Sequence, residues 1–436
     1  MRKKLFIGLT TLVAVFSLTS LAISQIDRKT KDDLYSQIEL YSYTLTTIQA
    51  DYVDEIPPKD LIYGSLKGML ATLDPHSQFL DPDEYKELKT ETQGKFGGLG
   101  IEISIRDGLL TVITPIEDTP AWREGVKAGD RIVKIEDEVT RDITLGDAVK
   151  KLRGKPGTDI NITVLRESES KILDFTITRE IITIQDVKNT QILEDKVGYV
   201  RLAEFREDSA KEFRKALDEL QAQGADSLIV DLRNNPGGLL NVAIKITEEF
   251  LTEGMTIVST KGRRYSQNTV TQSTNRSHLI DWPMVVLINE GSASGSEIFA
   301  GALKDNKRAI ILGTTSFGKG SVQSVIPLPD GSGLRLTTSK YFTPSGVSIH
   351  GTGITPDIVV EREVPPEEEK DKNNKDIEKI FNDIETNEEK NPETLKMSPK
   401  ELEAREKLLN DNQVRSAISV LKGIKVYKQL NGESKT

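Results

Sequence analysis

The chain has 436 residues, of which 36% are hydrophobic and 29% charged, an ordinary composition for a globular protein of several domains. Its 58 basic and 68 acidic residues give a net charge of -10 without a basic stripe, which argues against nucleic-acid binding. Because the chain has no cysteine, disulfides, thiolate catalysis and cysteine-based metal sites are excluded.

The first residues carry the pattern of an export signal. Three basic residues at positions 2–4 precede a nearly charge-free apolar run from Leu5 to Ile23, and Ser20-Leu21-Ala22 resembles a small-residue cleavage site. The run has a length between that of a cleaved signal and that of a membrane anchor. We therefore expect residues 1–24 to be a signal peptide or signal anchor. The rest of the chain would then lie in the periplasm or on the outer face of the cytoplasmic membrane.

Residues 30–93 have the pattern of a helical region. Apolar side chains from Leu34 to Ile48 recur at helical intervals, a second helix is predicted for Leu61–Leu73, and a third begins near Asp81-Pro82. Such helices suit packing or assembly, so the terminal helices are candidates for a homo-oligomer contact. His76 stands beside a proline turn and is interpreted as structural.

Residues 94–180 change to the two-residue period of strands. Strands are predicted at Leu109–Ile113, Arg131–Ile135 and Ile160–Leu165, and a helix at Asp147–Leu152, which together make a small α+β module. Its segments FGGLGIEI, DTPAWREGVKAGDRIVKIED and LRGKPGTDINITV resemble those of a PDZ domain.

The PDZ resemblance implies a peptide-binding loop. In such domains the glycine-rich loop before a strand offers amides to a peptide's terminal carboxylate while the peptide adds as a strand. Here those amides belong to Gly98, Leu99, Gly100 and Ile101. The alternative is that this loop only makes a tight turn. A dinucleotide-binding loop is not favoured, because the glycines enter a strand and not a helix.

Residues 181–362 alternate between strands and helices. Strands are predicted at Val197–Leu202, Leu228–Leu232 and Met284–Ile288, and helices at Ala210–Gln221 and Leu239–Phe250. The last of these strands leads into a block of small residues. A reactive group in that block would meet the free amides and the positive dipole end of a helix N-terminus.

The small-residue block offers three candidate nucleophiles, Ser292, Ser294 and Ser296. Ser294 stands three residues before Glu297, which also fits a capping box, so a helix cap is the alternative role. A serine hydroxyl needs a base, and a lysine serves only where burial keeps its amine neutral. Lys319, 25 residues after Ser294 in a second glycine-rich block, is the candidate base.

The second block, GTTSFGKGSVQ, also contains two misleading patterns. It fits G-x-x-x-x-G-K, but Gly320 stands where a phosphate loop needs Ser or Thr, and the next residues read as a strand. It also fits S-x-x-K of the penicillin-recognising enzymes, but Phe317-Gly318 is a poor helical turn. Neither pattern is interpreted as a site.

Together with DLRNNPGG at Asp231–Gly238, the two blocks resemble the carboxyl-terminal processing, or tail-specific, serine peptidases. The resemblance covers about residues 40–360 and implies an α/β serine peptidase core that follows the PDZ domain. It also implies roles for individual residues: Ser294 as nucleophile, Lys319 as general base, Gln323 as the group that orients the lysine, and the amides of Gly238 and Gly295 as the oxyanion hole. Asp305 is a further candidate, ranked below Gln323 because a carboxylate would raise the pKa of the lysine.

No metal or cofactor is expected, because no ligand cluster is visible in the sequence. His278 and His350 lie outside any motif and are interpreted as surface residues. Arg153, in the segment LRGKPGT, is a candidate contact between the PDZ domain and the catalytic domain.

Residues 363–397 are rich in both charge signs and are interpreted as a charged linker. Residues 398–436 regain helical spacing. Because a lone helix needs a partner face, we expect this region to pack on the N-terminal helices of the same chain or of a second subunit.

Two functions of different classes remain at this point. The favoured one is an exported serine endopeptidase that recognises substrate C-termini through its PDZ domain, with proteins or peptides as its partners. The alternative is a non-catalytic PDZ adaptor or scaffold in the cell envelope. The joint presence of Ser294, Lys319 and Gln323 favours the enzyme.

Overall fold

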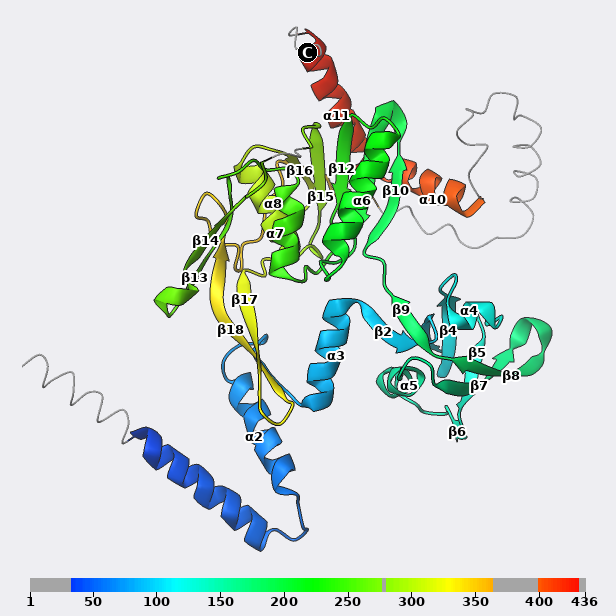
Figure 1. Ribbon diagram of the computed structural model, residues 1–436, viewed down its shortest axis with the longest axis vertical. Helices are drawn as coiled ribbons and strands as arrows, with labels where there is room; N and C mark the ends of the chain where they lie inside the picture. The colour runs from blue at the N-terminus through cyan, green and yellow to red at the C-terminus, as the bar shows by residue number, and fades with distance from the viewer. Residues whose placement is uncertain (1–32, 277–279, 364–398, 431–436) are drawn as a thin grey trace, which may run out of the picture. The chain divides into compact units, whose positions relative to one another are not determined.

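The computed structural model of the protein describes residues 33–276, 280–363 and 399–430 (Figure 1). The predicted export signal, His278 and nearly all of the charged linker lie outside these residues. Contacts divide the chain into two units. The first is Met1–Asp81 with Pro327–Arg335, and the second is Pro82–Ile326 with Leu336–Thr436.

The first unit is built from two helices and a short strand. Residues 33–51 and α2 (Pro58–Ala71) are helical, and β1 (Gln78–Leu80) pairs antiparallel with the start of β18 (Gly333–Phe342). The region predicted to be helical therefore also contains a strand, which lies between its second and third predicted helices. Only three residues long, β1 is too short for a two-residue period to stand out in the sequence.

The turn before β1 accounts for the position of His76. The carboxylate of Asp74 accepts hydrogen bonds from the amides of His76 and Ser77 at 2.8 and 2.9 Å, and from the Ser77 hydroxyl at 2.8 Å. An aspartate that accepts from the amides two and three positions ahead is a common way to make a turn. His76 thus occupies a turn position, in keeping with its structural interpretation.

The PDZ module of the second unit follows α3 (Pro82–Gln93) and is a small sheet with one main helix. The order of the sheet is β3-β4-β5-β7-β8, so β3 lies at an edge, and β2 pairs separately with β9. Its elements are β2 (Lys95–Gly98), β3 (Ile101–Arg106), β4 (Leu109–Pro115), α4 (Pro120–Arg123), β5 (Arg131–Ile135), β6 (Glu138–Val139), α5 (Leu145–Leu152), β7 (Asp159–Arg166), η1 (Glu167–Glu169), β8 (Lys171–Thr178) and β9 (Glu180–Thr183). All three strands and the helix predicted here from periodicity are confirmed.

The α/β region that follows the PDZ module is built on a six-stranded sheet with the order β10-β11-β12-β15-β16-β19. Its strands are β10 (Val187–Ile192), β11 (Val197–Leu202), β12 (Ser227–Asp231), β15 (Met284–Ile288), β16 (Ile310–Gly313) and β19 (Ile358–Val359), with η2 (Glu194–Lys196) between the first two. All neighbours are parallel except β10 and β11. A parallel sheet is covered on both faces, which explains why β15 reads MVVLI and is buried at every position.

One face of this sheet is covered by α6 (Ser209–Ala222), α7 (Leu240–Glu248) and α8 (Gly295–Asp305), as Figure 1 shows. Three aromatic rings hold these helices together. Phe250 lies edge-on to Phe213 at 6.2 Å and to Phe299 at 5.9 Å between ring centroids. Such pairs add to the free energy gained by burial, and they fix the axis of α8, whose first turn carries Ser294.

The other face is covered by the C-terminal region. The helix α11 (Asn412–Leu430), with Leu408 of α10 (Pro399–Asn410), packs on apolar side chains of the sheet. The buried helical side chains are Leu408, Val414, Ala417, Ile418 and Leu421. The second face of the sheet therefore provides the partner surface of this region, in place of the N-terminal helices of the same chain. Packing on the N-terminal helices of a second subunit stays a prediction.

A smaller sheet completes the core. It contains β13 (Thr256–Gly262), β14 (Thr269–Gln272), β17 (Ser321–Pro327) and β18, with η3 (Tyr265–Gln267) between β13 and β14. The chain enters β17 directly after Lys319-Gly320, so no helix follows the G-x-x-x-x-G-K pattern. No helix in the described ranges is both long and apolar enough to cross a membrane.

Candidate active site

Ser294 lies at the turn from β15 into α8, where it is the N-cap residue of the helix. Its backbone has φ 51° and ψ -108°, a conformation that costs a residue other than glycine about 1–3 kcal/mol. A strained turn from a strand into a helix is a recurrent position for a nucleophilic serine. The side chain is half-buried, whereas its neighbours in the helix are fully buried.

The other two serines of the block have structural partners. The hydroxyl of Ser292 donates to the carbonyl of Leu232 at 2.8 Å, and that of Ser296 donates to the carbonyl of Asn235 at 2.9 Å. Both serines are fully buried. These bonds join the block to the loop that follows β12, and they leave Ser294 as the accessible serine of the three.

The glycines after β12 pack directly against Ser294. A Cβ on Gly237 would lie 2.7 Å from the Ser294 Cβ and 2.7 Å from the Gly295 amide nitrogen, and one on Gly238 would lie 2.3 Å from the Phe205 carbonyl oxygen. Both glycines have positive φ, 101° and 137°. This close approach requires glycine, and it places the Gly237-Gly238 peptide beside the N-terminus of α8.

Glu297 joins the serine block to the lysine block. Its Oε2 accepts from the amides of Ser294 and Lys319, each at 2.8 Å. Its Oε1 accepts from the Ser316 hydroxyl and the Gly318 amide, each at 2.6 Å. Burial raises the pKa of this carboxyl, and the four hydrogen bonds act in the opposite direction by stabilising the ionised form.

The lysine block is held by its glycines. Gly318 has φ 90°, and a Cβ on Gly320 would lie 2.2 Å from the amide nitrogen of His350. Lys319 between them is half-buried, and its main chain leads into β17. Gln323 on β17 is also half-buried, and its side-chain nitrogen donates to the Ser321 hydroxyl at 2.8 Å.

Asp305 is not brought to Ser294. It ends α8, and the rise of a helix over 11 residues is about 16 Å. Its half-buried carboxylate accepts from the amide of Ser345 at 2.9 Å. His350 is exposed and contacts Gly320 through its backbone, so neither residue has the position of a catalytic partner for Ser294.

The glycine-rich loop of the PDZ module joins β2 to the edge strand β3. The carbonyls of Leu99 and Gly100 accept from the amides of Ala121 and Ile116 at 2.9 and 2.8 Å. Gly100 has φ 77°, and a Cβ there would lie 2.2 Å from the Thr119 side chain. The loop is thereby fixed next to a sheet edge to which a further strand can add.

Comparison with known proteins identifies the class of this site. The family model described as Peptidase family S41 matches residues 196–360, and a PDZ-domain model matches residues 111–166. A carboxy-terminal-processing protease of Bartonella bacilliformis is 44% identical over 359 residues, which cover 80% of this chain and 82% of that protein. The chain belongs to peptidase family S41. It is a serine protease with a PDZ domain, and its predicted mixed α/β architecture is confirmed.

Two further relatives carry similar names. A carboxyl-terminal-processing protease of Synechocystis sp. is 40% identical over 307 residues, 69% of this chain and 71% of that protein. A solved structure of photosystem II D1 C-terminal processing protease is 30% identical with a TM-score of 0.44, and the match covers 74% of this chain and 92% of that one.

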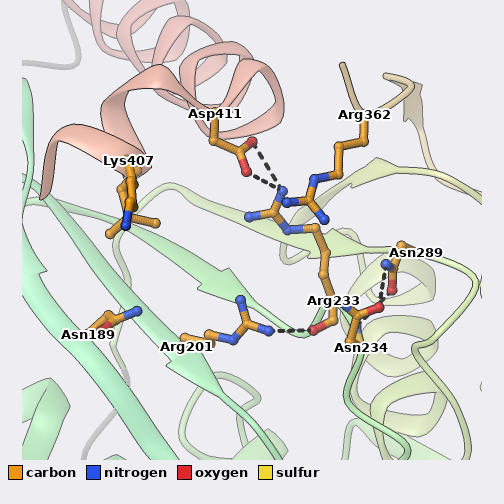
Figure 2. A pocket seen from close by; sticks show the side chains of 9 residues that line it. Asn189, Arg201, Arg233, Asn234, Asn289, Arg362, Lys407 and Asp411 are labelled. Atoms are coloured by element: carbon orange, nitrogen blue, oxygen red, sulfur yellow. Dashed lines mark hydrogen bonds and ion pairs between the residues drawn. The ribbon is translucent and has the colours of Figure 1, made fainter. Parts of the chain in front are cut away.

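Two groups of this peptidase were not assigned a role from the sequence. The first is Glu297, which the spacing S-x-x-E indicates only as part of a capping box. The second group is the buried pair of Asp231 and Arg233 in the loop after β12. Arg233 donates to Asp231 at 3.0 and 2.7 Å. It also donates to Asp411 at 3.1 and 2.8 Å (Figure 2).

Arg153 also differs from its prediction. Its guanidinium lies over the ring of Phe96 at 4.4 Å and forms an ion pair with Glu87 of α3 at 3.5 Å. Its observed partners therefore belong to α3 and to β2 of the PDZ module, and not to the catalytic sheet.

Proposed function

We propose that this S41 peptidase is an exported endopeptidase that recognises the C-termini of protein substrates through its PDZ domain and cleaves them with Ser294 and Lys319. The observation that carries the catalytic assignment is the shared acceptor. The amides of Ser294 and Lys319 both donate to Oε2 of Glu297. Two blocks that are 25 residues apart in sequence thereby meet at one carboxylate.

In the proposed reaction, neutral Lys319 takes the proton of the Ser294 hydroxyl as the serine attacks a peptide carbonyl. The amides of Gly238 and Gly295 stabilise the oxyanion, and protonated Lys319 returns a proton to the leaving amine. Water then releases the acyl group. Gln323, four residues after Lys319, orients the lysine side chain. The position of Asp305 at the far end of α8 leaves it outside this set.

Selection of substrates by their C-termini rests on the PDZ module. Its glycine-rich loop enters an edge strand, and α5 lies beside that strand, which is the arrangement that binds a peptide as an added strand. The amides of Gly98, Leu99, Gly100 and Ile101 would hold the terminal carboxylate. The names of the relatives, which process carboxyl termini, support the same activity for this chain.

Export and assembly are part of the proposal. The basic start and apolar run of residues 2–23 support export to the periplasm or the outer face of the cytoplasmic membrane, with the segment either cleaved or kept as an anchor. The helix of residues 33–51 exposes large apolar side chains, among them Leu34 at 59%, Tyr35 at 69% and Tyr43 at 71%. A homo-oligomer through this helix would cover them.

The catalytic proposal is tested with purified protein and an unstructured substrate. We expect Ser294→Ala and Lys319→Ala to abolish cleavage, while Asp305→Asn, a control on the same helix as Ser294, keeps the rate within about threefold of wild type, as expected for a surface substitution. Equal cleavage by all four proteins would refute the mechanism. Removal of the last few residues of the substrate should slow cleavage. An unchanged rate would refute recognition of the substrate C-terminus by the PDZ module.

A further inference from the structure

Phe205 contacts both residues whose amides form the proposed oxyanion hole. It lies in the segment between β11 and α6, and its side chain is fully buried. Its main chain pairs with Gly238, and its ring lies against Gly295. These two glycines come from different loops, one after β12 and one after β15. A single residue outside both loops therefore touches both halves of the proposed hole.

The main chain of Phe205 holds the glycine loop on either side of Gly238. The Phe205 amide donates to the carbonyl of Gly237 at 2.8 Å, and the Phe205 carbonyl accepts from the amide of Leu239 at 2.7 Å. These two bonds form a parallel bridge. They use the groups before and after Gly238 and not the Gly238 amide itself, which is the proposed donor. The bridge thus fixes the direction of this amide without occupying it.

The ring of Phe205 supports the second proposed donor. A Cβ added to Gly295 would lie 3.1 Å from the Cδ2 atom and 3.4 Å from the Cγ atom of this ring, and 3.4 Å from the Cβ of Ala243. Because protein interiors are close-packed, a ring in this position prevents the first turn of α8 from moving towards it. Loss of the ring would leave space into which the Gly295 amide could shift.

Arg206 fixes the segment that carries Phe205. Its side chain forms an ion pair with the buried carboxylate of Asp186, and its Nε donates to the carbonyl of Glu91 at 3.1 Å. Its amide donates to the Ser209 hydroxyl at 2.7 Å, and that hydroxyl donates to Asp186 at 2.6 Å. Glu91 belongs to α3 and Ser209 begins α6. The segment is therefore held at two helices, one of which leads into the PDZ module.

We propose that Phe205 is a positioning residue of the oxyanion hole, which holds the amides of Gly238 and Gly295 in place, and that Arg206 holds Phe205. The inference rests on the proposed function, in which these two amides are the donors. Donors that are already in position need no reorganisation as charge develops on the substrate carbonyl. A shift of the donors removes an interaction of the transition state, so it lowers kcat and leaves KM unchanged.

The first test is Phe205→Leu in the full chain, assayed with an unstructured substrate. The substitution keeps an apolar side chain but removes the ring edge that lies against Gly295. We expect kcat to fall roughly 10- to 100-fold, because complete loss of one donor costs about 100- to 1000-fold. KM should stay within about threefold of wild type. Values of kcat are given per folded molecule, with the folded fraction taken from thermal unfolding.

Leu217→Ala is the matched control for a loss of core packing. Leu217 is also fully buried in the same core, on α6, and its substitution removes as many carbon atoms as Phe205→Leu does. It should destabilise the protein and keep the kcat of wild type. A general effect of core packing on activity would affect both variants equally, whereas the positioning role affects only Phe205→Leu.

The second test is Arg206→Gln, which removes the ion pair with Asp186 and the bond to α3. We expect kcat to fall about tenfold at constant KM, the scale of a displacement of less than 1 Å. Arg214→Gln is its control. Arg214 is likewise half-buried and ion-paired, with Asp218 at 3.2 Å, but it lies on α6. This variant should keep the kcat of wild type.

The inference is overturned if Phe205→Leu keeps the kcat of wild type, or if Leu217→Ala lowers kcat as much as Phe205→Leu does. A rise in KM at constant kcat would also overturn it, because the segment would then act in substrate binding. A wild-type kcat in Arg206→Gln would overturn the part assigned to Arg206. Failure of the proposed function gives a different result, since Ser294→Ala would then still cleave the substrate.

Discussion

The amides of Ser294 and Lys319 donate to the same oxygen of Glu297, each at 2.8 Å. This carboxylate is fully buried, and its other oxygen accepts from Ser316 and Gly318. All four acceptor positions are thus used by donors from the two blocks. The relative position of the serine and lysine main chains depends on a single ionised side chain at the base of α8.

Glu297→Gln is predicted to reduce kcat/KM by about 100-fold or more, the scale of a displacement of about 1 Å between reacting groups. The substitution replaces one acceptor oxygen with an amide nitrogen, which would face two donors. Steady-state cleavage of an unstructured substrate measures the effect. Glu290→Gln is the matched control, because this neighbouring glutamate is exposed and, among the residues that the structure describes, accepts only from Thr314, at 3.2 Å. Similar rates for both variants would contradict the role of Glu297.

Ser316→Ala is predicted to move the acid limb of the pH-rate profile to higher pH. The Ser316 hydroxyl donates to Glu297, so its removal raises the pKa of a carboxyl that burial has already raised. A proton on Glu297 would displace one of its four hydrogen-bond donors and so disturb the positions of Ser294 and Lys319. Activity is therefore lost as pH falls through this raised pKa. The effect of Glu297 on the free energy of unfolding has the opposite pH dependence. Because its pKa is higher in the folded than in the unfolded state, Glu297 stabilises the fold at low pH, and this stabilisation is lost as pH rises through the folded-state pKa.

The pH prediction is checked by comparing the midpoint of the acid limb in wild type and Ser316→Ala. Ser324→Ala is the control, since that hydroxyl is paired with Thr338 at 2.8 Å on β17 and β18. Identical midpoints in all three proteins would show that the acid limb does not depend on Glu297.

Gly237→Ala is predicted to reduce kcat by about 100-fold, because its Cβ would lie 2.7 Å from the Ser294 Cβ and the Gly295 amide. Gly254→Ala is the control, because it introduces the strain of a positive φ without a steric clash. Gly254 has φ 86° with nothing within 4 Å of its added Cβ, so it should lose about 1–2 kcal/mol of stability and keep its kcat. Equal kcat values for the two variants would show that the close approach to Ser294 has no catalytic importance.

Much of the fold was predictable, because apolar residues recur at the helix or strand period wherever one face of an element is buried. The buried run MVVLI of β15 and the helices around Phe213 and Ile246 were identified in this way. The partner of α11 could not be predicted, because Val414, Ile418 and Leu421 indicate an apolar stripe but not the surface that receives it. The role of Glu297 was hidden for a related reason, since its donors lie up to 22 residues away from it in the sequence.

Leu421→Ala is predicted to lower the free energy of unfolding by about 2–5 kcal/mol, the usual cost of a cavity at a fully buried leucine. The reason is that α11 forms one layer of the catalytic core. Leu430→Ala in the same helix is the control, because that side chain is 79% exposed and its truncation should change stability by less than about 0.5 kcal/mol. Denaturant unfolding measures both, and equal effects would contradict the packing of α11 on the sheet.

Gly100→Ala is predicted to abolish the preference for substrates with an intact C-terminus while leaving the catalytic groups unaltered. The glycine has φ 77°, and an added Cβ would lie 2.2 Å from the Cβ of Thr119, so the loop that presents the amides must move. Gly108→Ala is the control in the same module, with φ 75° and no atom within 4 Å of the added Cβ. Cleavage of a tailed protein is compared with that of the same protein without its tail. The ratio of the two rates should fall to about one in Gly100→Ala and stay as in wild type in Gly108→Ala, because only the first substitution displaces the amides that would bind a terminal carboxylate. A ratio that survives in both variants would place tail recognition elsewhere in the chain.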